Sequence, residues 1–216
     1  MRSATALLTP LVAAALLSGL AGCGTGAASA GGAAPSAGSS GSSNSTDGSS
    51  PVAAGTPSAG PLARSVPVRL EIPSIGVDTP VIPLALASDG SVDVPPIEAH
   101  SPAGWYQGSP TPGQVGPSVI LAHVTVGQYG DGVFLHLARL KPGDRVVAML
   151  QNGASAVFTV DSVQTVAKSR FPTSAVYGNV NHPALRLITC GGPRGSGRSG
   201  YPDNVVVYAS LASASR

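Results

Sequence analysis

The sequence is poor in aromatic residues and in charges. Aromatic residues make up 4% of the chain and charged residues 10%. Twelve Lys and Arg stand against ten Asp and Glu, a formal net charge of +2, and these charges form no run or stripe that could follow a phosphate backbone. Nucleic acid is therefore not expected as a partner. With 43% hydrophobic residues, the chain has enough apolar side chains for one modest domain.

Cysteine and metal-ligating clusters are also scarce. The two cysteines, Cys23 and Cys190, are too few for a disulfide framework. The histidines have no zinc-like partners, and the carboxylates are scattered rather than arranged in a loop of fixed spacing. No metal and no other cofactor is expected.

Long hydrophobic runs are missing as well. The apolar stretch from Leu7 to Leu20 is shorter than the roughly 20 residues that span a bilayer, and Pro10 interrupts it. With Arg2 before it and small residues after it, residues 1–23 are predicted to be an export signal. The ending "LAGC" resembles a bacterial lipobox, so Cys23 is the predicted lipidation site. An ordinary cleaved signal and an uncleaved short anchor are the alternatives.

Residues 24–65 are almost entirely Ala, Gly, Ser, Thr and Pro, with no apolar periodicity. Such a composition cannot bury a core, so this segment is predicted to be a disordered linker that tethers a folded domain to the membrane. The folded domain is predicted over residues 66–212. Its location would then be the outer face of the cytoplasmic membrane, in the cell envelope.

Short β-type stretches separated by turn residues fill the domain. They are "VRLEI" (68–72), "TPVIPL" (79–84), "SVDV" (91–94), "SVILAH" (118–123), "DRVVAML" (144–150), "AVFTVDSVQTVAK" (156–168), "ALRLITC" (184–190) and "NVVVYASL" (204–211). Eight short strands favour a closed β-barrel, because closure removes exposed edges.

The apolar runs "SVILA" and "NVVVYA" are nearly continuous, which predicts strands buried on both faces. One or two short helices are expected. The first is "SPAGWY", capped by Ser101 with Pro102 at its first position, and the second is "GVFLHLARL".

Two strand ends carry groups suited to covalent catalysis. His123 closes "SVILAH" and Cys190 closes "ALRLITC", so adjacent or parallel strands would deliver imidazole and thiol to one rim. A thiol is mostly protonated at neutral pH and needs a neighbouring base or cation to become a nucleophile. From the residues alone, a buried and inert cysteine is the more frequent case, since a lone cysteine in a strand is more often a small core residue.

The Gly-rich segment after Cys190 carries Arg194 and Arg198. A guanidinium near the thiol would donate hydrogen bonds to a developing oxyanion. Solvated loop charges are the alternative for both arginines.

Together these motifs resemble the sortases, most closely the actinobacterial class F. The resemblance rests on "GWYQGSPTPGQVGPSVILAHV" (104–124), "VFLHLARLKPGDRV" (133–146), "LRLITCGG" (185–192) and "YPDNVVVYA" (201–209), and it covers residues 66–211. It implies an eight-stranded sortase-type barrel and a cysteine transpeptidase or endopeptidase of the hydrolase class. The enzyme would cleave an LPXTG-like sorting signal through a thioacyl intermediate. The resemblance implies two kinds of partner: secreted proteins with a C-terminal sorting signal, and the amine of a peptidoglycan precursor.

Residue by residue, the resemblance makes Cys190 the nucleophile, preceded by Thr189, and His123 the acid and base. The family arginine lies near the start of the last strand, where this chain has Pro202, so Arg198 is the predicted arginine and Arg194 the alternative. This departure leaves open a weakened or differently tuned enzyme. The predicted lipobox is a second departure, because the family usually has an N-terminal transmembrane helix.

Two other functions remain open. An L,D-transpeptidase-like envelope enzyme would use the same residue types, but its pattern has an arginine within two residues after the nucleophile, where this chain has Gly191 and Gly192. A non-catalytic, lipid-anchored β-barrel binding module would keep Cys190 buried and unreactive.

Overall fold

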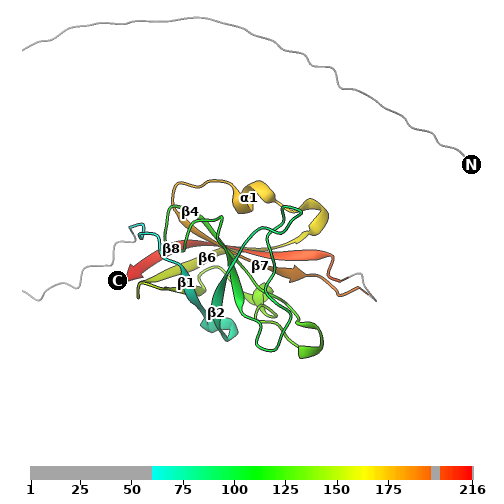
Figure 1. Ribbon diagram of the computed structural model, residues 1–216. Coiled ribbons are helices and arrows are strands. Elements are labelled where there is room, and N and C mark those ends of the chain that lie inside the picture. The colour runs from blue at the N-terminus through cyan, green and yellow to red at the C-terminus, as the bar shows by residue number, and fades with distance from the viewer. Residues whose placement is uncertain (1–59, 196–199, 216) are drawn as a thin grey trace, which may run out of the picture. The chain divides into compact units, whose positions relative to one another are not determined.

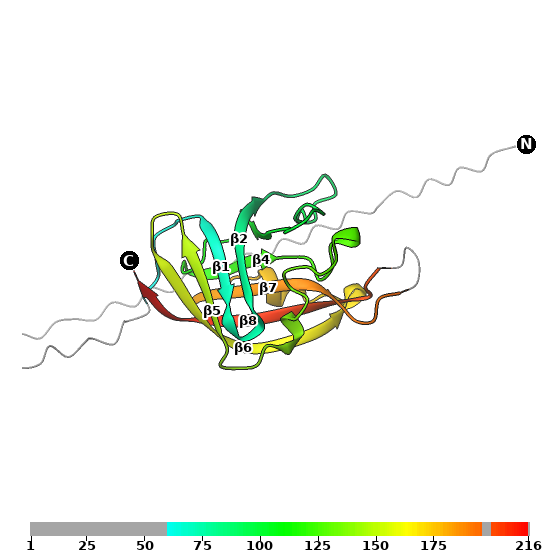
Figure 2. The same cartoon turned by 90° about the horizontal axis from the view of Figure 1, so that it is seen from below.

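The computed structural model describes residues 60–195 and 200–215, which include eight strands closed into one barrel. The strand order around the barrel is β1-β2-β3-β4-β7-β8-β6-β5 (Figures 1 and 2). The predicted export signal, Cys23 and the predicted linker up to residue 59 lie outside the described residues. A mostly β fold with a closed eight-stranded barrel and very short helices is confirmed.

The strands are bounded as follows: β1 Pro67–Ile72, β2 Val77–Leu84, β3 Ala103–Tyr106, β4 Gly116–Leu121, β5 Arg145–Leu150, β6 Ser155–Ala167, β7 Pro183–Gly191 and β8 Asp203–Ser215. The α-helix of the described residues is α1, Thr173–Tyr177, between β6 and β7. The 3-10 turns are η1 Pro73–Ile75, η2 Gly127–Tyr129, η3 Leu137–Arg139 and η4 Lys168–Arg170. None of the helices in this part of the chain is long and apolar enough to cross a membrane.

Two apolar clusters hold the domain together. The large one fills the barrel and includes the fully buried side chains of Trp105, Phe134 and Phe158. The small one lies between the sheet and α1, and its buried members are Val119, Val176, Ile188 and Val206. Strands β4, β7 and β8 contribute to both clusters, so the expectation that "SVILA" and "NVVVYA" are covered on two faces is confirmed.

The pairing of β4 with β7 decides what meets at the end of the barrel. These two strands are parallel neighbours, with Ile120 opposite Leu187 and Leu121 opposite Ile188. Both strands therefore end at the same end of the barrel. Figures 1 and 2 show the arrowhead of β7 at that end, while β8 finishes at the opposite one.

One expected strand and one expected helix are wrong. Residues 91–94 form no strand, and Val92 makes an isolated bridge with Leu86. Pro95 and Pro96 follow directly, and proline lacks the N–H that a sheet ladder requires. The segment "SPAGWY" is not helical, because its residues 103–106 form β3, which pairs with β2 and β4. Burial of Trp105 outweighs the local capping signal.

The other expected helix is shorter than predicted, and α1 has no counterpart among the predicted elements. Within "GVFLHLARL" the structure forms turns and the three-residue 3-10 helix η3. At the N-terminal end of the described residues, Leu62 is buried and its N–H donates a hydrogen bond to the carbonyl of Gly113. The chain therefore contacts the barrel a few residues before β1 begins.

Candidate active site

Cys190 is the second-last residue of β7 and a half-buried, free thiol. It lies on the wall of a cavity of about 190 Å³. The other residues of that wall are Val124, Phe134, Leu135, Ala138, Thr165, Thr189, Gly191, Gly192, Tyr201 and Val205. The thiol is thus partly exposed at the barrel end rather than sealed in the core, which fits a reactive cysteine better than an inert one.

His123 lies two residues beyond the end of β4 and is half-buried. Its Nε2 is 2.7 Å from the backbone carbonyl oxygen of Pro95, a buried residue of the connection between β2 and β3. A carbonyl oxygen can only accept, so Nε2 carries a proton in this arrangement. In the neutral ring Nδ1 is therefore the nitrogen left to take a proton.

The backbones beneath these two side chains are joined. Thr189 donates a hydrogen bond from its hydroxyl to the carbonyl of Ala122 at 2.7 Å, and the Ala122 N–H donates to the carbonyl of Ile188 at 3.2 Å. These bonds continue the parallel register past the last ladder pair, so His123 and Cys190 stand at the same level of neighbouring strands. No hydrogen bond joins the two side chains in the part of the chain that the structure describes.

The chain after His123 is fixed by its own turn. Phe134 donates its N–H to the carbonyl of His123 at 3.0 Å, and Gly132 donates its N–H to the carbonyl of Val124 at 3.0 Å. A side chain at Gly132 would collide with the carbonyl group of His123. The backbone that presents the imidazole therefore has little freedom.

Of the two predicted arginines, the structure describes only Arg194. Arg198 lies outside the described residues. Arg194 is exposed, and its guanidinium carbon is 6.0 Å from the ring centroid of Tyr201. Tyr201 in turn donates its hydroxyl to Thr125 at 3.4 Å, which ties the segment before β8 to the chain that follows His123.

A cation that the sequence reasoning missed lies beside the thiol. The ammonium nitrogen of Lys168, at the end of β6, is 3.6 Å from Cys190 Sγ. Strand β6 pairs with β8 and β8 pairs with β7, which brings Lys168 near a residue 22 positions away. No local sequence pattern predicts this contact. The sequence does place Lys168 at the end of the predicted strand "AVFTVDSVQTVAK".

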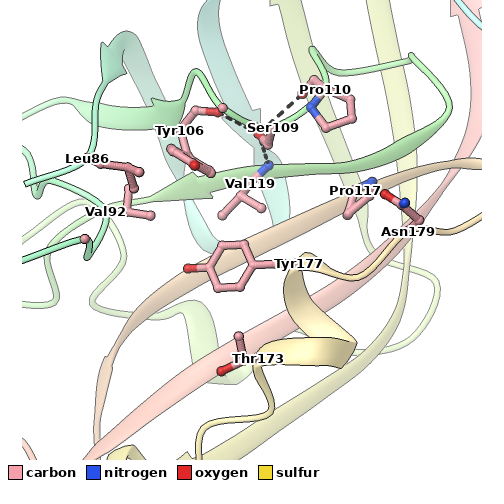
Figure 3. A pocket seen from close by; sticks show the side chains of 12 residues that line it. Leu86, Val92, Tyr106, Ser109, Pro110, Pro117, Val119, Thr173, Tyr177 and Asn179 are labelled. Atoms are coloured by element: carbon pink, nitrogen blue, oxygen red, sulfur yellow. Dashed lines mark hydrogen bonds between the residues drawn. The ribbon is translucent and has the colours of Figure 1, made fainter. Parts of the chain in front are cut away.

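A larger cavity, about 460 Å³, lies on the outer face of the sheet (Figure 3). Tyr177 of α1 faces Val119 of β4 across it, and Tyr106 of β3 stands beside them. The rings of Tyr106 and Tyr177 meet edge to face at 6.4 Å. Leu86 and Val92 of the connection between β2 and β3 add apolar side chains to the lining, which also includes the polar residues Ser109, Thr173 and Asn179.

Arg186 connects β7 to α1, which forms one wall of this cavity. It is a buried residue of β7, its guanidinium carbon lies 4.7 Å from the ring centroid of Tyr208, and its Nε donates to the carbonyl of Ala175 in α1 at 3.4 Å. Burial lowers the pKa of Arg186, and burial raises the pKa of Tyr177 and of Tyr208. Within the described residues, no group of three or more His, Cys, Asp or Glu side chains could hold a metal ion.

A closed eight-stranded barrel with a partly exposed thiol and an imidazole at the ends of two parallel strands is the arrangement of an enzyme that uses a cysteine nucleophile. The sequence profile of the Sortase domain matches residues 70–212. The chain therefore belongs to the sortase family. No curated protein sequence matches it.

Solved structures of sortases share this fold. Sortase A from Corynebacterium diphtheriae aligns with a TM-score of 0.52 and 21% identity, covering 69% of this chain and 62% of that one. Its lid mutant aligns with a TM-score of 0.51 and 20% identity, covering 70% and 72%. Sortase C1 from Streptococcus agalactiae, in complex with MTSET, aligns with a TM-score of 0.50 and 19% identity, covering 66% and 65%. The chain thus spans less than two thirds of the first of these proteins.

Proposed function

We propose that this protein is a cysteine transpeptidase that cleaves an LPXTG-like sorting signal and transfers the new carboxyl end to an amine of a cell-wall precursor. The observation that carries the proposal is the parallel pairing of β4 with β7, which sets His123 and Cys190 at one level in a sortase barrel. The class F subtype is part of the proposal and rests on the sequence motifs.

The reaction has two acyl transfers. In the first, His123 takes the proton of the Cys190 thiol, the sulfur forms a bond to the carbonyl carbon of the scissile peptide, the C–N bond breaks, and His123 gives that proton to the departing amine. In the second, the acceptor amine attacks the thioester carbon, His123 takes a proton from it, and the C–S bond breaks. The thiol is regenerated, so no oxidant or cofactor is consumed.

The 460 Å³ cavity is suited to the apolar end of the peptide. Arg186, opposite Val119 in the register, shares one face of β7 with Ile188 and Cys190, because side chains alternate along a strand. Cys190 lies four positions after Arg186, which is about 13 Å in an extended chain. An extended peptide whose scissile carbonyl is at Cys190 would then place its Leu-Pro end between Val119 and Tyr177.

Two further assignments belong to this proposal. Arg198 supplies hydrogen bonds to the oxyanion, with Arg194 as the alternative. Lipid on Cys23 holds the protein at the outer face of the cytoplasmic membrane. Replacing each arginine by Ala and comparing kcat tests the first. Mass spectrometry and membrane fractionation of Cys23→Ser test the second, and equal fractionation without lipid on the parent would disprove it.

The direct test is a library of sorting peptides incubated with the purified protein, with and without amine acceptors. Cleavage that needs Cys190, and acceptor-dependent ligation, are expected. Leu86→Trp should raise KM for peptides with Leu at the first position, because Leu86 is an exposed residue of the lining and the larger indole would occupy the cavity. If Cys190 resists alkylation and no peptide is cleaved, the binding module is the better account.

A further inference from the structure

We propose that Lys168 is a further catalytic residue, whose ammonium group is the counter-charge of the Cys190 thiolate and of the oxyanion formed when that thiolate attacks. The observation is the 3.6 Å separation of Lys168 Nζ from Cys190 Sγ. As a role in acyl transfer, the inference rests on the proposed function. The electrostatic contact itself can be tested without any substrate.

The backbone holds Lys168 where its side chain reaches the thiol. The Lys168 N–H donates to the carbonyl of Pro202 at 3.0 Å, one residue after the last β6–β8 pair, Ala167 with Asp203. Asn204 of β8 is opposite both Val166 of β6 and Cys190 of β7. The side chain of Lys168 therefore passes only the first residues of β8 to reach the sulfur of Cys190.

No carboxylate of the described residues competes for this ammonium. The ion pairs found there are those of Arg69 with Glu71 and Asp78. The nearby carboxylate of Asp203 lies against Gly192. Residues 196–199, which the structure does not describe, are Ser, Gly, Arg and Ser and contain no carboxylate.

The chemistry follows from where negative charge appears. The thiolate is the nucleophile, and attack moves its charge to the carbonyl oxygen, one bond away from the new C–S bond. A cation next to Sγ stabilises the first anion and is close to the second. Lys168 keeps its proton throughout, so the step needs no additional acid. The imidazole, held by the carbonyl of Pro95, remains the proton carrier.

The substrate-free test compares two alkylating reagents of opposite character in the full-length protein. Iodoacetate is anionic and iodoacetamide is neutral, so the ratio of their rates with Cys190 reports the local charge. Lys168→Met should lower this ratio about five- to tenfold, the size expected for removing one charge near 4 Å in a solvated setting. Lys168→Arg should keep most of it. High salt should lower the ratio of the parent and leave that of Lys168→Met nearly unchanged.

The matched control is Arg170→Met, which removes a charge from the same turn, η4, while Lys168 stays. It should change the reagent ratio by less than about twofold, given screening at the surface. In peptide cleavage, Lys168→Met should lower kcat/KM about tenfold, with thermal stability close to that of the parent.

Two results would overturn the inference. One is an unchanged reagent ratio in Lys168→Met. The other is peptide found by mass spectrometry on the Lys168 amine, which would make that amine an acyl acceptor rather than a fixed cation. A parent that cleaves no peptide but shows the expected loss of ratio would refute the proposed function and leave the contact between Lys168 and Cys190 standing.

Discussion

The hydroxyl of Thr189 donates a hydrogen bond of 2.7 Å to the backbone carbonyl of Ala122, between β7 and the end of β4. Each residue immediately precedes one of the proposed catalytic residues, and both are buried. This bond continues the strand pairing after the regular ladder has ended. The spacing of thiol and imidazole thus depends on a side chain that takes no part in the chemistry.

Replacing Thr189 by Val keeps the shape of the side chain and removes this bond. Because the Ala122 carbonyl is then left without its partner, we expect a loss of about 1–2 kcal/mol in the free energy of unfolding. Peptide cleavage should fall about tenfold, a change of roughly 1.4 kcal/mol in activation free energy. Thr189→Ser keeps the hydroxyl and should keep most of the activity. Urea unfolding and kcat/KM measure both effects, and a fully active Val variant would contradict the assigned role.

Gly132 leaves no room for a side chain beside the carbonyl group of His123. Gly132→Ala should displace the backbone of His123 and lower kcat by about 10²-fold, since small misplacements of a catalytic group are costly. Gly130→Ala is the control in the same loop. Its φ of +89° makes Ala strained by roughly 1 kcal/mol, but open space surrounds it, so stability should fall while activity survives. Equal activity of the two variants would argue against the positional explanation.

The bond from His123 to the Pro95 carbonyl separates position from proton transfer. His123→Gln can keep a donor near Pro95 but cannot carry a proton, so cleavage should fall by about 10²–10⁴-fold. Its thermal stability should stay near that of the parent, whereas His123→Ala should also loosen the connection between β2 and β3. Peptide kinetics and thermal unfolding distinguish the two, and an active Gln variant would remove His123 from the mechanism.

Burial raises the pKa of Tyr177 above its ordinary value of 10.0. The unfolded chain therefore ionises first as the pH rises, which stabilises the unfolded state relative to the folded one. The stability of the parent should be unaffected by this group below about pH 10 and should fall as the pH rises from there toward the pKa of the folded state. Tyr177→Phe should make the urea midpoint fall less between pH 9 and 11. An identical fall in parent and variant would show that Tyr177 is not the cause.

Much of the barrel could be predicted because its strands are apolar runs bounded by turn residues. The reactive end was predictable for a related reason: His123 and Cys190 each close such a run. Strand β3 was not predictable in this way. It is four residues long and begins after Pro102, and Gly104 admits the side chain of Leu84 where a Cβ would collide. Its extended form is decided by tertiary packing of Trp105 rather than by local preference.

The contact of Lys168 with Cys190 shows why the rest of the site could not be predicted. It depends on the register of β6 against β8 and of β8 against β7. The register of β6 against β8 shifts twice, between Val157 and Phe158 and between Val160 and Ser162. A one-residue slip would turn every side chain of a strand to the other face. Sequence spacing does not indicate such register shifts. The position of Lys168 beside the Cys190 thiol could therefore be seen only in the folded chain.

Intact-mass measurement of the acyl-enzyme shows directly whether Cys190 is the nucleophile of a sortase reaction. The protein is mixed with an LPXTG-type peptide without an amine acceptor, quenched in acid and weighed, then digested to locate the added mass. We expect a thioester on Cys190 that carries the N-terminal part of the peptide, is released by hydroxylamine, and is absent in Cys190→Ala. Failure to find any adduct with the whole peptide library, or an adduct that persists in Cys190→Ala, would contradict that expectation.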